Sequence, residues 1–224
     1  MIDFVKCSVV IPCYNSQNSI TELVERLLNE DLNMFKITEI ICVNDFSNDN
    51  TLEILKDLDK SYDEVKILNN SQNLGQVQST LYGIRYSNEE FIVTLDDDLQ
   101  HPVEEVYKLL NTCFNENLDF VIGTWKLNEN KIRNFSSYVA NFILNLISLN
   151  FDGYKFTAFR VINSRIKKNM VEVLDNTLMM DLRKISKNYK MVMVNHNSKP
   201  FGREFTPFLY RVKLIFNHIK NELG

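Results

Sequence analysis

The sequence lacks the features that mark several large classes of protein. Its 224 residues contain no run of about 18 or more uncharged apolar residues, so we expect no helix that spans a membrane. The first residues, MIDFVKCSVVIP, show no basic leader followed by a long apolar stretch and a cleavage site. We therefore expect no secretory signal and a cytoplasmic protein.

Cysteine is scarce, and no repeat, linker or low-complexity stretch is visible. The 4 cysteines include no C-x-x-C pair and have no histidine at metal-ligand spacing, so we expect reduced thiols in the core. With 45% hydrophobic and 24% charged residues, the composition predicts one domain over residues 1–224. No G-x-G-x-x-G follows the first predicted strand, which argues against a dinucleotide-dependent oxidoreductase.

The net charge of −4 conceals an asymmetry between the two parts of the chain. Residues 1–125 carry 8 Lys and Arg against 22 Asp and Glu, whereas residues 126–224 carry 17 against 7. An acidic part suits cation binding, and a basic part suits phosphates or anionic lipid headgroups. Solvated surface charge is the alternative explanation for the basic part.

Short β-branched segments alternate with longer amphipathic segments in the first part of the chain. This alternation is typical of a parallel sheet covered by helices. The predicted strands are 7–12, 39–44, 65–69, 91–96 and 120–123, and the predicted helices are 19–29, 50–58, 76–87 and 102–115. The order predicts an α/β protein with an open nucleotide-binding sheet, in which Pro102 occupies the first turn of its helix.

Polar residues follow four of these strands. They are Tyr14 and Asn15, then Asn44 and Asp45, then residues 73–75, and then residues 96–101. Ligands of such a sheet bind beyond the carboxyl ends of the strands, so we expect the four clusters to meet at one edge.

The segment TLDDDLQHP, residues 94–102, places three successive carboxylates after an apolar strand. Adjacent like charges repel, and carboxylate and amide oxygens suit Mg²⁺ or Mn²⁺, with a diphosphate completing the coordination shell. A metal there would neutralise charge on a leaving nucleoside diphosphate. The alternative is that these carboxylates cap the helix predicted from Pro102.

The segment VNDFSNDNT, residues 43–51, again leads from a strand through a turn into a helix. Ser47 or Asn48 could cap that helix. Asp45, at the tip of the strand, could bind the base or ribose of a nucleotide or act as a cap, and the residues alone do not decide between the two.

Four segments, in their order and spacing, resemble the motifs of family 2 glycosyltransferases with the GT-A fold. They are SVVIPCYN at 8–15, VNDFSNDNT at 43–51, NLG at 73–75 and LDDDLQHP at 95–102. The last resembles the branch of polyprenyl-phosphate sugar synthases. The resemblance implies a Rossmann-like, mostly parallel sheet with helices on both faces and a smaller helical region on the acceptor side.

The resemblance also implies roles for individual residues. The nucleotide-sugar pocket would include Pro12, Tyr14, Asn15, Asp45, Gly75, Asp96 and Asp97, and Asp98 and Gln100 would hold the metal. Within these four segments the chain departs from the family at two positions. Asn44 stands where an aspartate is usual, and Asp97 stands where a small residue is commoner. Further departures are Glu204 in place of a serine in a later loop and GTWK at 123–126 in place of an arginine after the fifth strand.

The basic part extends the resemblance. The segment FRVINSR, residues 159–165, is similar to a Phe-Arg segment of the family, and residues 194–205 resemble its loop of the pattern His-x-x-Arg-x-x-Gly-Lys-Ser. Lys199 and Arg203 of this loop would bring cations to the diphosphate. His196, taken alone, is as well explained as a partly buried histidine with ordinary partners. Cations expected on the acceptor side are Lys126, Arg133 and Arg160.

The functional hypotheses differ in the chemical group that accepts the sugar. A polyprenyl phosphate already carries an anionic oxygen and needs no strong base, whereas a sugar or lipid hydroxyl needs a carboxylate such as Asp181 to accept its proton. A catalytically silent nucleotide-binding protein is a third hypothesis. We expect a nucleotide-diphospho-sugar donor and no nucleic acid as partners, and homo-oligomer formation stays open.

Two apolar segments raise the question of a membrane surface. Residues 208–219 place their apolar side chains on one helical face beside several cations, and residues 132–151 form a largely apolar predicted helix. We expect peripheral binding to anionic lipid through this patch. Packing of the same faces on the domain is the alternative.

Overall fold

The computed structural model describes residues 4–126, 154–170 and 178–197. The chain divides into two compact units, one made of residues 1–124 and 156–201 and the other of residues 125–155 and 202–224. The candidate site lies in the first unit. The predictions for residues 132–151 and 208–219 fall outside the described residues.

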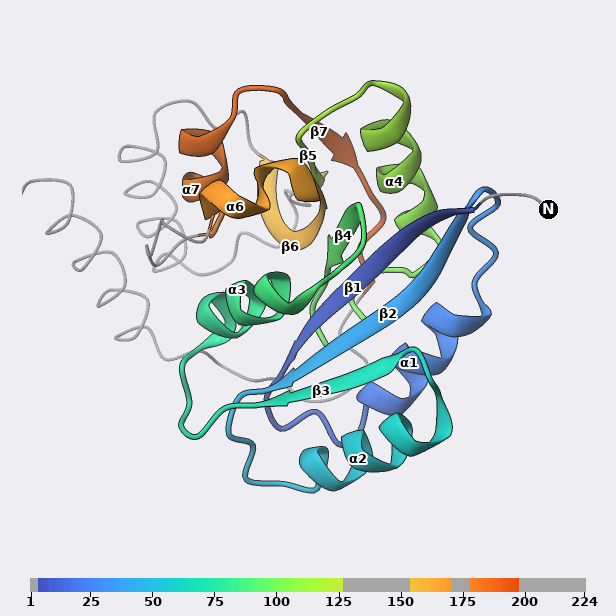
Figure 1. Cartoon of the computed structure of the whole chain (residues 1–224), viewed down its shortest axis with the longest axis vertical. Helices are drawn as coiled ribbons and strands as arrows, with labels where there is room; N and C mark the ends of the chain where they lie inside the picture. The colour runs from blue at the N-terminus through green and yellow to red at the C-terminus, as the bar shows by residue number, and fades with distance from the viewer. Residues whose placement is uncertain (1–3, 127–153, 171–177, 198–224) are drawn as a thin grey trace, which may run out of the picture. The chain divides into compact units, whose positions relative to one another are not determined.

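A seven-stranded sheet forms the centre of the first unit (Figure 1). Its strands are β1 (Val5–Cys13), β2 (Phe35–Asn44), β3 (Val65–Asn69), β4 (Phe91–Thr94), β5 (Phe120–Lys126), β6 (Tyr154–Asn163) and β7 (Tyr189–Met193). Their order in the sheet is β3-β2-β1-β4-β6-β5-β7. Strands β1 to β4 pair in parallel, β6 runs antiparallel to β4, and β7 runs parallel to β5.

Helices connect the strands and cover both faces of the sheet. They are α1 (Ile20–Asn29), α2 (Thr51–Ser61), α3 (Gln76–Tyr86), α4 (Glu105–Asn115), α6 (Lys167–Met170) and α7 (Leu178–Ile185), with a short 3₁₀ helix, η2, at Ser164–Ile166. In the three described ranges, no helix is both long enough and apolar enough to cross a membrane.

The predicted order of the first five strands and four helices is confirmed, although several ends differ, most of all the start of β2, which lies at Phe35 rather than Glu39. Strand β4 ends at Thr94 rather than Asp96, and α4 begins at Glu105 rather than Pro102. Between them Leu99 has a φ of 60°, and the Glu105 amide donates to the Pro102 carbonyl in a turn before the helix. Strands β6 and β7 were not predicted, and β7 contains no fully buried residue to mark it.

Strand β1 buries both of its faces. Cys7, Val9 and Ile11 of β1 belong to the core formed with α1, α2 and α4. Val10 faces the other way, toward α3, and a Cβ added at Gly83 of that helix would lie 2.4 Å from the Val10 Cγ1 atom. In Figure 1, α3 accordingly lies on one side of strands β1 to β3, and α1 and α2 lie on the other. The close approach explains why glycine stands at position 83.

All four cysteines are free and buried, as predicted for core thiols. Burial raises the pKa of Cys7 to about 12, and burial likewise raises the pKa of Cys113 to about 12. Both thiols therefore stay protonated at neutral pH, and protonated thiols are poor nucleophiles.

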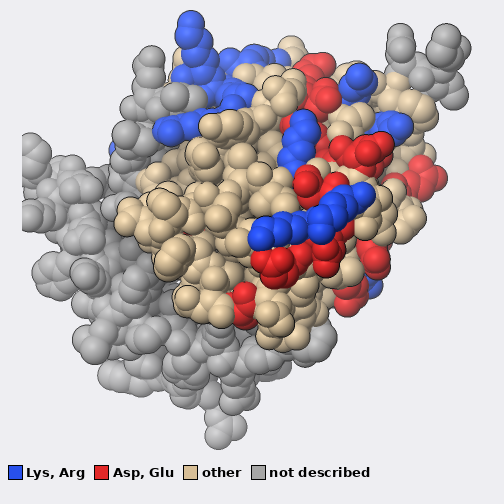
Figure 2. Space-filling model, turned by 60° about the horizontal axis from the view of Figure 1, so that its bottom comes forward, with Lys and Arg blue, Asp and Glu red and all other residues tan. Residues whose placement is uncertain are grey.

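The surface carries many charges of both signs. Figure 2 shows acidic and basic side chains next to one another over much of the right-hand part of the face in view. Ion pairs at helical spacing occur on exposed positions of α1 and α2, such as Arg26 with Glu22 at 3.6 Å and Lys56 with Glu53 at 2.7 Å. Pairs of this kind contribute little to stability because water screens them.

One buried charge is different. The carboxylate of Glu39 in β2, whose side chain is 3% exposed, accepts hydrogen bonds from Lys66 Nζ at 2.6 Å and Ser8 Oγ at 2.7 Å. It also accepts from the main-chain and side-chain N–H groups of Asn88, both at 3.0 Å. Burial alone would raise the pKa of Glu39, but these donors together hold it below its ordinary value. The carboxylate thus joins β1, β2, β3 and the chain that enters β4.

We predict that Glu39→Gln lowers the free energy of unfolding at pH 7 by about 1–3 kcal/mol, because buried donors lose a charged acceptor. A carboxylate with a depressed pKa stabilises the fold above its ordinary pKa, and that stabilisation is lost as the pH falls through the folded value. The difference between wild type and variant should therefore shrink in acid, below about pH 4. Denaturant unfolding at several pH values measures it. Glu22→Gln is the exposed control with little expected effect, and a gap for Glu39→Gln that is constant from pH 7 to pH 3 would contradict the prediction.

Candidate active site

The loops at the carboxyl ends of β1 to β4 lie at one edge of the sheet, because these strands are parallel (Figure 1). The polar clusters predicted from the sequence follow these strand ends. Side chains of one loop hydrogen-bond to main-chain groups of another, so the four clusters do meet, as expected.

Asp45, directly after β2, is 2% exposed and holds the loop that follows β3. Its Oδ1 atom accepts hydrogen bonds from Leu74 N and Asn70 Nδ2, both at 2.8 Å, and its Oδ2 atom accepts from Gly75 N at 2.8 Å. Gly75 has a φ of +85°, which glycine adopts without strain. The carboxylate of Asp45 thus holds the loop after β3 in place. Contact of Asp45 with the base of a nucleotide stays a prediction.

The loop after β1 is bound to the loop after β2 by side chains. The Asn15 amide donates to Ser47 Oγ at 3.1 Å, the Asn48 amide donates to Asn15 Oδ1 at 2.9 Å, and the Ser16 amide donates to Thr51 Oγ1 at 2.7 Å. Tyr14 is 44% exposed at the start of this loop. Pro12, which was also expected in the pocket, is buried inside β1.

Neither predicted set of helix caps is found. Helix α2 has Asn50 at its N-cap position, and the Thr51 amide donates to Asp49 Oδ1 at 3.0 Å, so Ser47 and Asn48 do not cap it. They are instead engaged with the loop after β1. Helix α4 has Glu104 at its N-cap without a side-chain hydrogen bond, so the carboxylates of residues 96–98 are not caps either.

The three carboxylates of residues 96–98 point to different partners. Asp96 Oδ1 accepts from Gln76 Nε2 of α3, and Asp96 Oδ2 lies 3.8 Å from His101 Nε2. Asp97 Oδ2 accepts from the Tyr14 amide at 3.2 Å and from Ser16 Oγ. Burial raises the pKa of Asp97 to about 6, against the lowering effect of these two hydrogen bonds, and the charges of its two neighbours add to the rise.

The side-chain oxygens of Asp98 and Gln100 could act as ligands of a hard cation, with a bound substrate supplying further ligands. Asp98 Oδ1 accepts from the Gln100 amide at 3.2 Å, and Gln100 Nε2 donates to the Asn197 carbonyl at 3.5 Å, which leaves the oxygen of the Gln100 side chain for a ligand. Among the described residues, no three His, Cys, Asp or Glu side chains gather into a metal site. Mg²⁺ commonly takes only one or two carboxylates and completes its shell with water and phosphate.

Arg160 of β6 places a cation at the same strand end. It lies opposite Thr94, the last residue of β4, and is 8% exposed. Its Nε atom is buried and has no hydrogen-bond partner among the residues that the structure describes. Burial lowers the pKa of Arg160 to about 10, and the charge of Asp96 acts in the opposite direction. A buried N–H group without such a partner is costly unless a ligand supplies one.

Sequence patterns did not reveal how the chain after β7 is anchored. The first residue of α4, Glu105, accepts through Oε1 from the Asn195 amide at 3.0 Å and from Asn195 Nδ2 at 2.6 Å. The Asn197 amide donates to the Gln100 carbonyl at 2.9 Å. His101 is buried, stacks on Phe159 and meets the ring of His196 edge-on at 5.5 Å. Residues 195–197 therefore lie against the acidic turn.

Several predicted site residues cannot be placed in this geometry. Lys199, Arg203 and Arg133 lie outside the described residues. Lys126 ends β5 and Asp181 lies in α7, but their side chains are not among those described.

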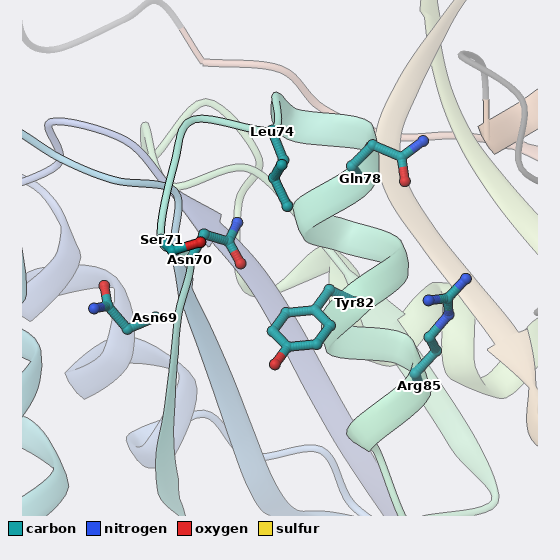
Figure 3. Close-up of a pocket in the computed structure, with 7 residues that line it drawn as sticks. All are labelled: Asn69, Asn70, Ser71, Leu74, Gln78, Tyr82 and Arg85. Atoms are coloured by element: carbon teal, nitrogen blue, oxygen red, sulfur yellow. The ribbon is translucent and has the colours of Figure 1, made fainter.

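A separate pocket of about 320 Å³ lies between α3 and the loop after β3 (Figure 3). Its lining residues are Asn69, Asn70, Ser71, Leu74, Gln78, Tyr82 and Arg85. Asn70 also donates to Asp45, so the pocket adjoins the loop that Asp45 supports. None of the carboxylates of residues 96–98 lines it.

A mostly parallel sheet with polar loops at its carboxyl edge is an α/β fold of the nucleotide-binding kind. The family model for glycosyl transferase family 2 matches residues 8–179, so the chain belongs to that family. An undecaprenyl-phosphate 4-deoxy-4-formamido-L-arabinose transferase of Salmonella choleraesuis is 27% identical over 218 residues, covering 95% of this chain and 66% of that protein. The chain spans about one third to two thirds of the length of the curated relatives that it matches first.

Two solved structures illustrate the fold. Mannosyl-3-phosphoglycerate synthase from Rubrobacter xylanophilus matches with a TM-score of 0.70 at 14% identity, covering 97% of this chain and 75% of that one. A mannosyltransferase from Pyrobaculum calidifontis, in complex with GDP-Man and Mn²⁺, matches with a TM-score of 0.61 at 13% identity, covering 96% and 64%. The family and the GT-A fold expected from the motifs are thus confirmed.

We predict that Glu105→Ala frees residues 195–197 from α4. The Asn195 amide should exchange with solvent at least about tenfold faster, and the free energy of unfolding should fall by about 1–3 kcal/mol, because a charged acceptor of two hydrogen bonds is lost. Hydrogen exchange followed by NMR measures both effects. Glu116→Ala, which removes an exposed ion pair with Lys190, is the control. Unchanged exchange of Asn195 in Glu105→Ala would contradict the prediction.

Proposed function

We propose that this chain transfers a sugar, with inversion, from a nucleotide-diphospho-sugar to a polyprenyl-phosphate acceptor at a membrane surface. The observation that carries the proposal is the pairing of opposite charges at one strand end. The acidic turn of residues 96–98 offers carboxylates to a cation, and the buried Arg160 offers a guanidinium to an anion. A metal-bound diphosphate and an acceptor phosphate need both kinds of charge.

Asp98 and Gln100 are the proposed metal ligands, and either Mg²⁺ or Mn²⁺ suits their oxygens. The bound ion would neutralise the charge that develops on the leaving diphosphate. A structural relative solved with GDP-Man and Mn²⁺ supports a divalent ion, and the resemblance to the family motif supports the choice of these two residues. Lys199 and Arg203 would add cations on the basis of the family motif.

The nucleoside would lie along the loops after β1 and β3. Tyr14 has an exposed ring, and Asn15 follows it in the loop after β1. Gly75 belongs to the loop after β3 that Asp45 holds. Asp96, in the turn after β4, would face the ribose and diphosphate. In this arrangement Asp45 shapes the pocket through the loop from Asn70 to Gly75.

The acceptor is proposed from the relative named an undecaprenyl-phosphate sugar transferase and from the buried cation. A phosphate oxygen is anionic at neutral pH, so transfer to it needs positioning and charge compensation rather than a strong base. Arg160 supplies a guanidinium for that purpose, with Arg133 and Lys126 as further cations on the acceptor side.

We predict that nucleoside diphosphates bind at least about tenfold more tightly with Mn²⁺ than with EDTA, and that Asp98→Asn removes most of this difference, because the ion loses a charged ligand. Calorimetric titration with UDP, GDP, CDP and dTDP measures it. Asp57→Asn, on the exposed side of α2, is the control. Equal affinities with Mn²⁺ and with EDTA for all four nucleotides would rule out the metal.

We predict opposite effects of Arg160→Met on stability and on transfer. Removal of a buried guanidinium whose Nε atom has no described hydrogen-bond partner should leave the melting temperature unchanged or raise it, whereas transfer to undecaprenyl phosphate should fall at least about tenfold. Extraction of labelled sugar into organic solvent measures the transfer. In the matched variant Arg165→Met, loss of the bonds to Asp119 and Asn117 should lower the melting temperature. Full transfer by Arg160→Met, or product only on soluble glycans, would contradict the proposed acceptor.

A further inference from the structure

Asp97 is the middle carboxylate of the acidic turn, but its contacts lead away from a ligand. Its Oδ2 atom accepts from the main-chain amide of Tyr14 at 3.2 Å and from the hydroxyl of Ser16. Ser16 is buried, so water has little access to this hydroxyl. Asp97 therefore joins the turn after β4 to the loop after β1.

The loop after β1 depends on side chains for its position. Four successive amides, those of residues 14–17, donate to Asp97, Ser47, Thr51 and Asp49, respectively. Three of these acceptors belong to the segment after β2. Among the hydrogen bonds of these four amides, only the one to Asp97 reaches the acidic turn. A loop held by side chains moves when one of them is removed, because no ladder of main-chain bonds fixes it.

The two segments that Asp97 joins are the two ends of the proposed donor site. Tyr14 lies where the nucleoside would lie, and the neighbours Asp96 and Asp98 lie where the diphosphate and its cation would lie. A nucleoside diphosphate must contact both segments at once. Their separation therefore decides how well its two parts can bind together.

We propose that Asp97 is a positioning residue that sets the distance between the loop carrying Tyr14 and the metal-binding turn. Its two accepted hydrogen bonds perform this role, and its negative charge does not. The inference rests on the proposed function, since it takes the nucleoside diphosphate as the ligand. It assigns Asp97 a role different from direct contact with the nucleotide.

Two substitutions separate hydrogen bonding from charge. Asp97→Ala and Asp97→Asn remove the same negative charge, but the carbonyl oxygen of asparagine still accepts hydrogen bonds from Tyr14 N and Ser16 Oγ. The difference between the two variants therefore isolates the contribution of the hydrogen bonds. Two probes, each with Mn²⁺, report on different parts of the site. A nucleoside diphosphate such as GDP or UDP needs both segments, and inorganic pyrophosphate needs only the metal-binding turn.

Calorimetric titration of both variants with both probes tests the inference. Asp97→Asn should bind the nucleoside diphosphate at least about tenfold more tightly than Asp97→Ala, whereas their affinities for pyrophosphate should agree within about threefold. If the two variants bind the nucleoside diphosphate equally, the hydrogen bonds do not position the site, and the inference is overturned. A difference of the same size for pyrophosphate would overturn it as well, because the damage would then lie in the turn itself.

A double-mutant cycle with Ser16→Ala provides a second measurement. Ser16→Ala removes one of the two donors, so its effect on the melting temperature should be contained within that of Asp97→Ala, and the double variant should melt no lower than Asp97→Ala alone. Strictly additive effects would show that the two side chains act separately, and would overturn the inference.

The cycle also separates this inference from the proposed function. If the wild-type chain binds neither pyrophosphate nor any nucleoside diphosphate, the proposed donor site is wrong. The coupling between Asp97 and Ser16 in thermal unfolding would then decide alone whether Asp97 ties the two loops together.

Discussion

The loops at the carboxyl edge of the sheet have main-chain amides that no strand or helix can satisfy, and acidic side chains satisfy many of them. Asp45 accepts from the amides of Leu74 and Gly75, Asp97 accepts from Tyr14, and Glu105 accepts from Asn195. A buried amide without a hydrogen-bond partner is costly, so these accepted bonds hold the loops in place. The arrangement of the candidate site depends on this interaction.

Because loop amides need acceptors, the acidic residues of the loops at this edge fall into two groups. Carboxylates that hold loops accept from N–H and O–H donors of the protein, Asp45 through both oxygens and Asp97 through Oδ2. Asp96 accepts from the side chain of Gln76, and Asp98 accepts from the main-chain amide of Gln100. Several of these carboxylates therefore hold loops, and Asp98 is the one proposed to bind a cation.

Two buried charged residues of the sheet, Glu39 and Arg160, differ in the same way in how many partners the protein supplies. Glu39 receives four donors and joins three strands, which is the pattern of a group that stabilises the fold. Arg160 has a buried Nε atom without a partner among the described residues, and it lies beside the acidic turn. A buried N–H group that folding leaves without a hydrogen-bond partner is better explained by a ligand than by stability.

Local patterns in the sequence determined the first five strands, the four long helices and the edge where their polar loops meet, because periodicity and turn chemistry act over a few residues. The family motifs were also visible, since they lie within those loops. Only the tertiary structure decided which carboxylate holds which loop: Asp97 and Tyr14 are 83 residues apart, and Glu105 and Asn195 are 90 apart. The same holds for Arg160, whose neighbour across the sheet, Thr94, lies on a distant strand. No local rule specifies such pairs, because they form only when the whole sheet brings their strands together.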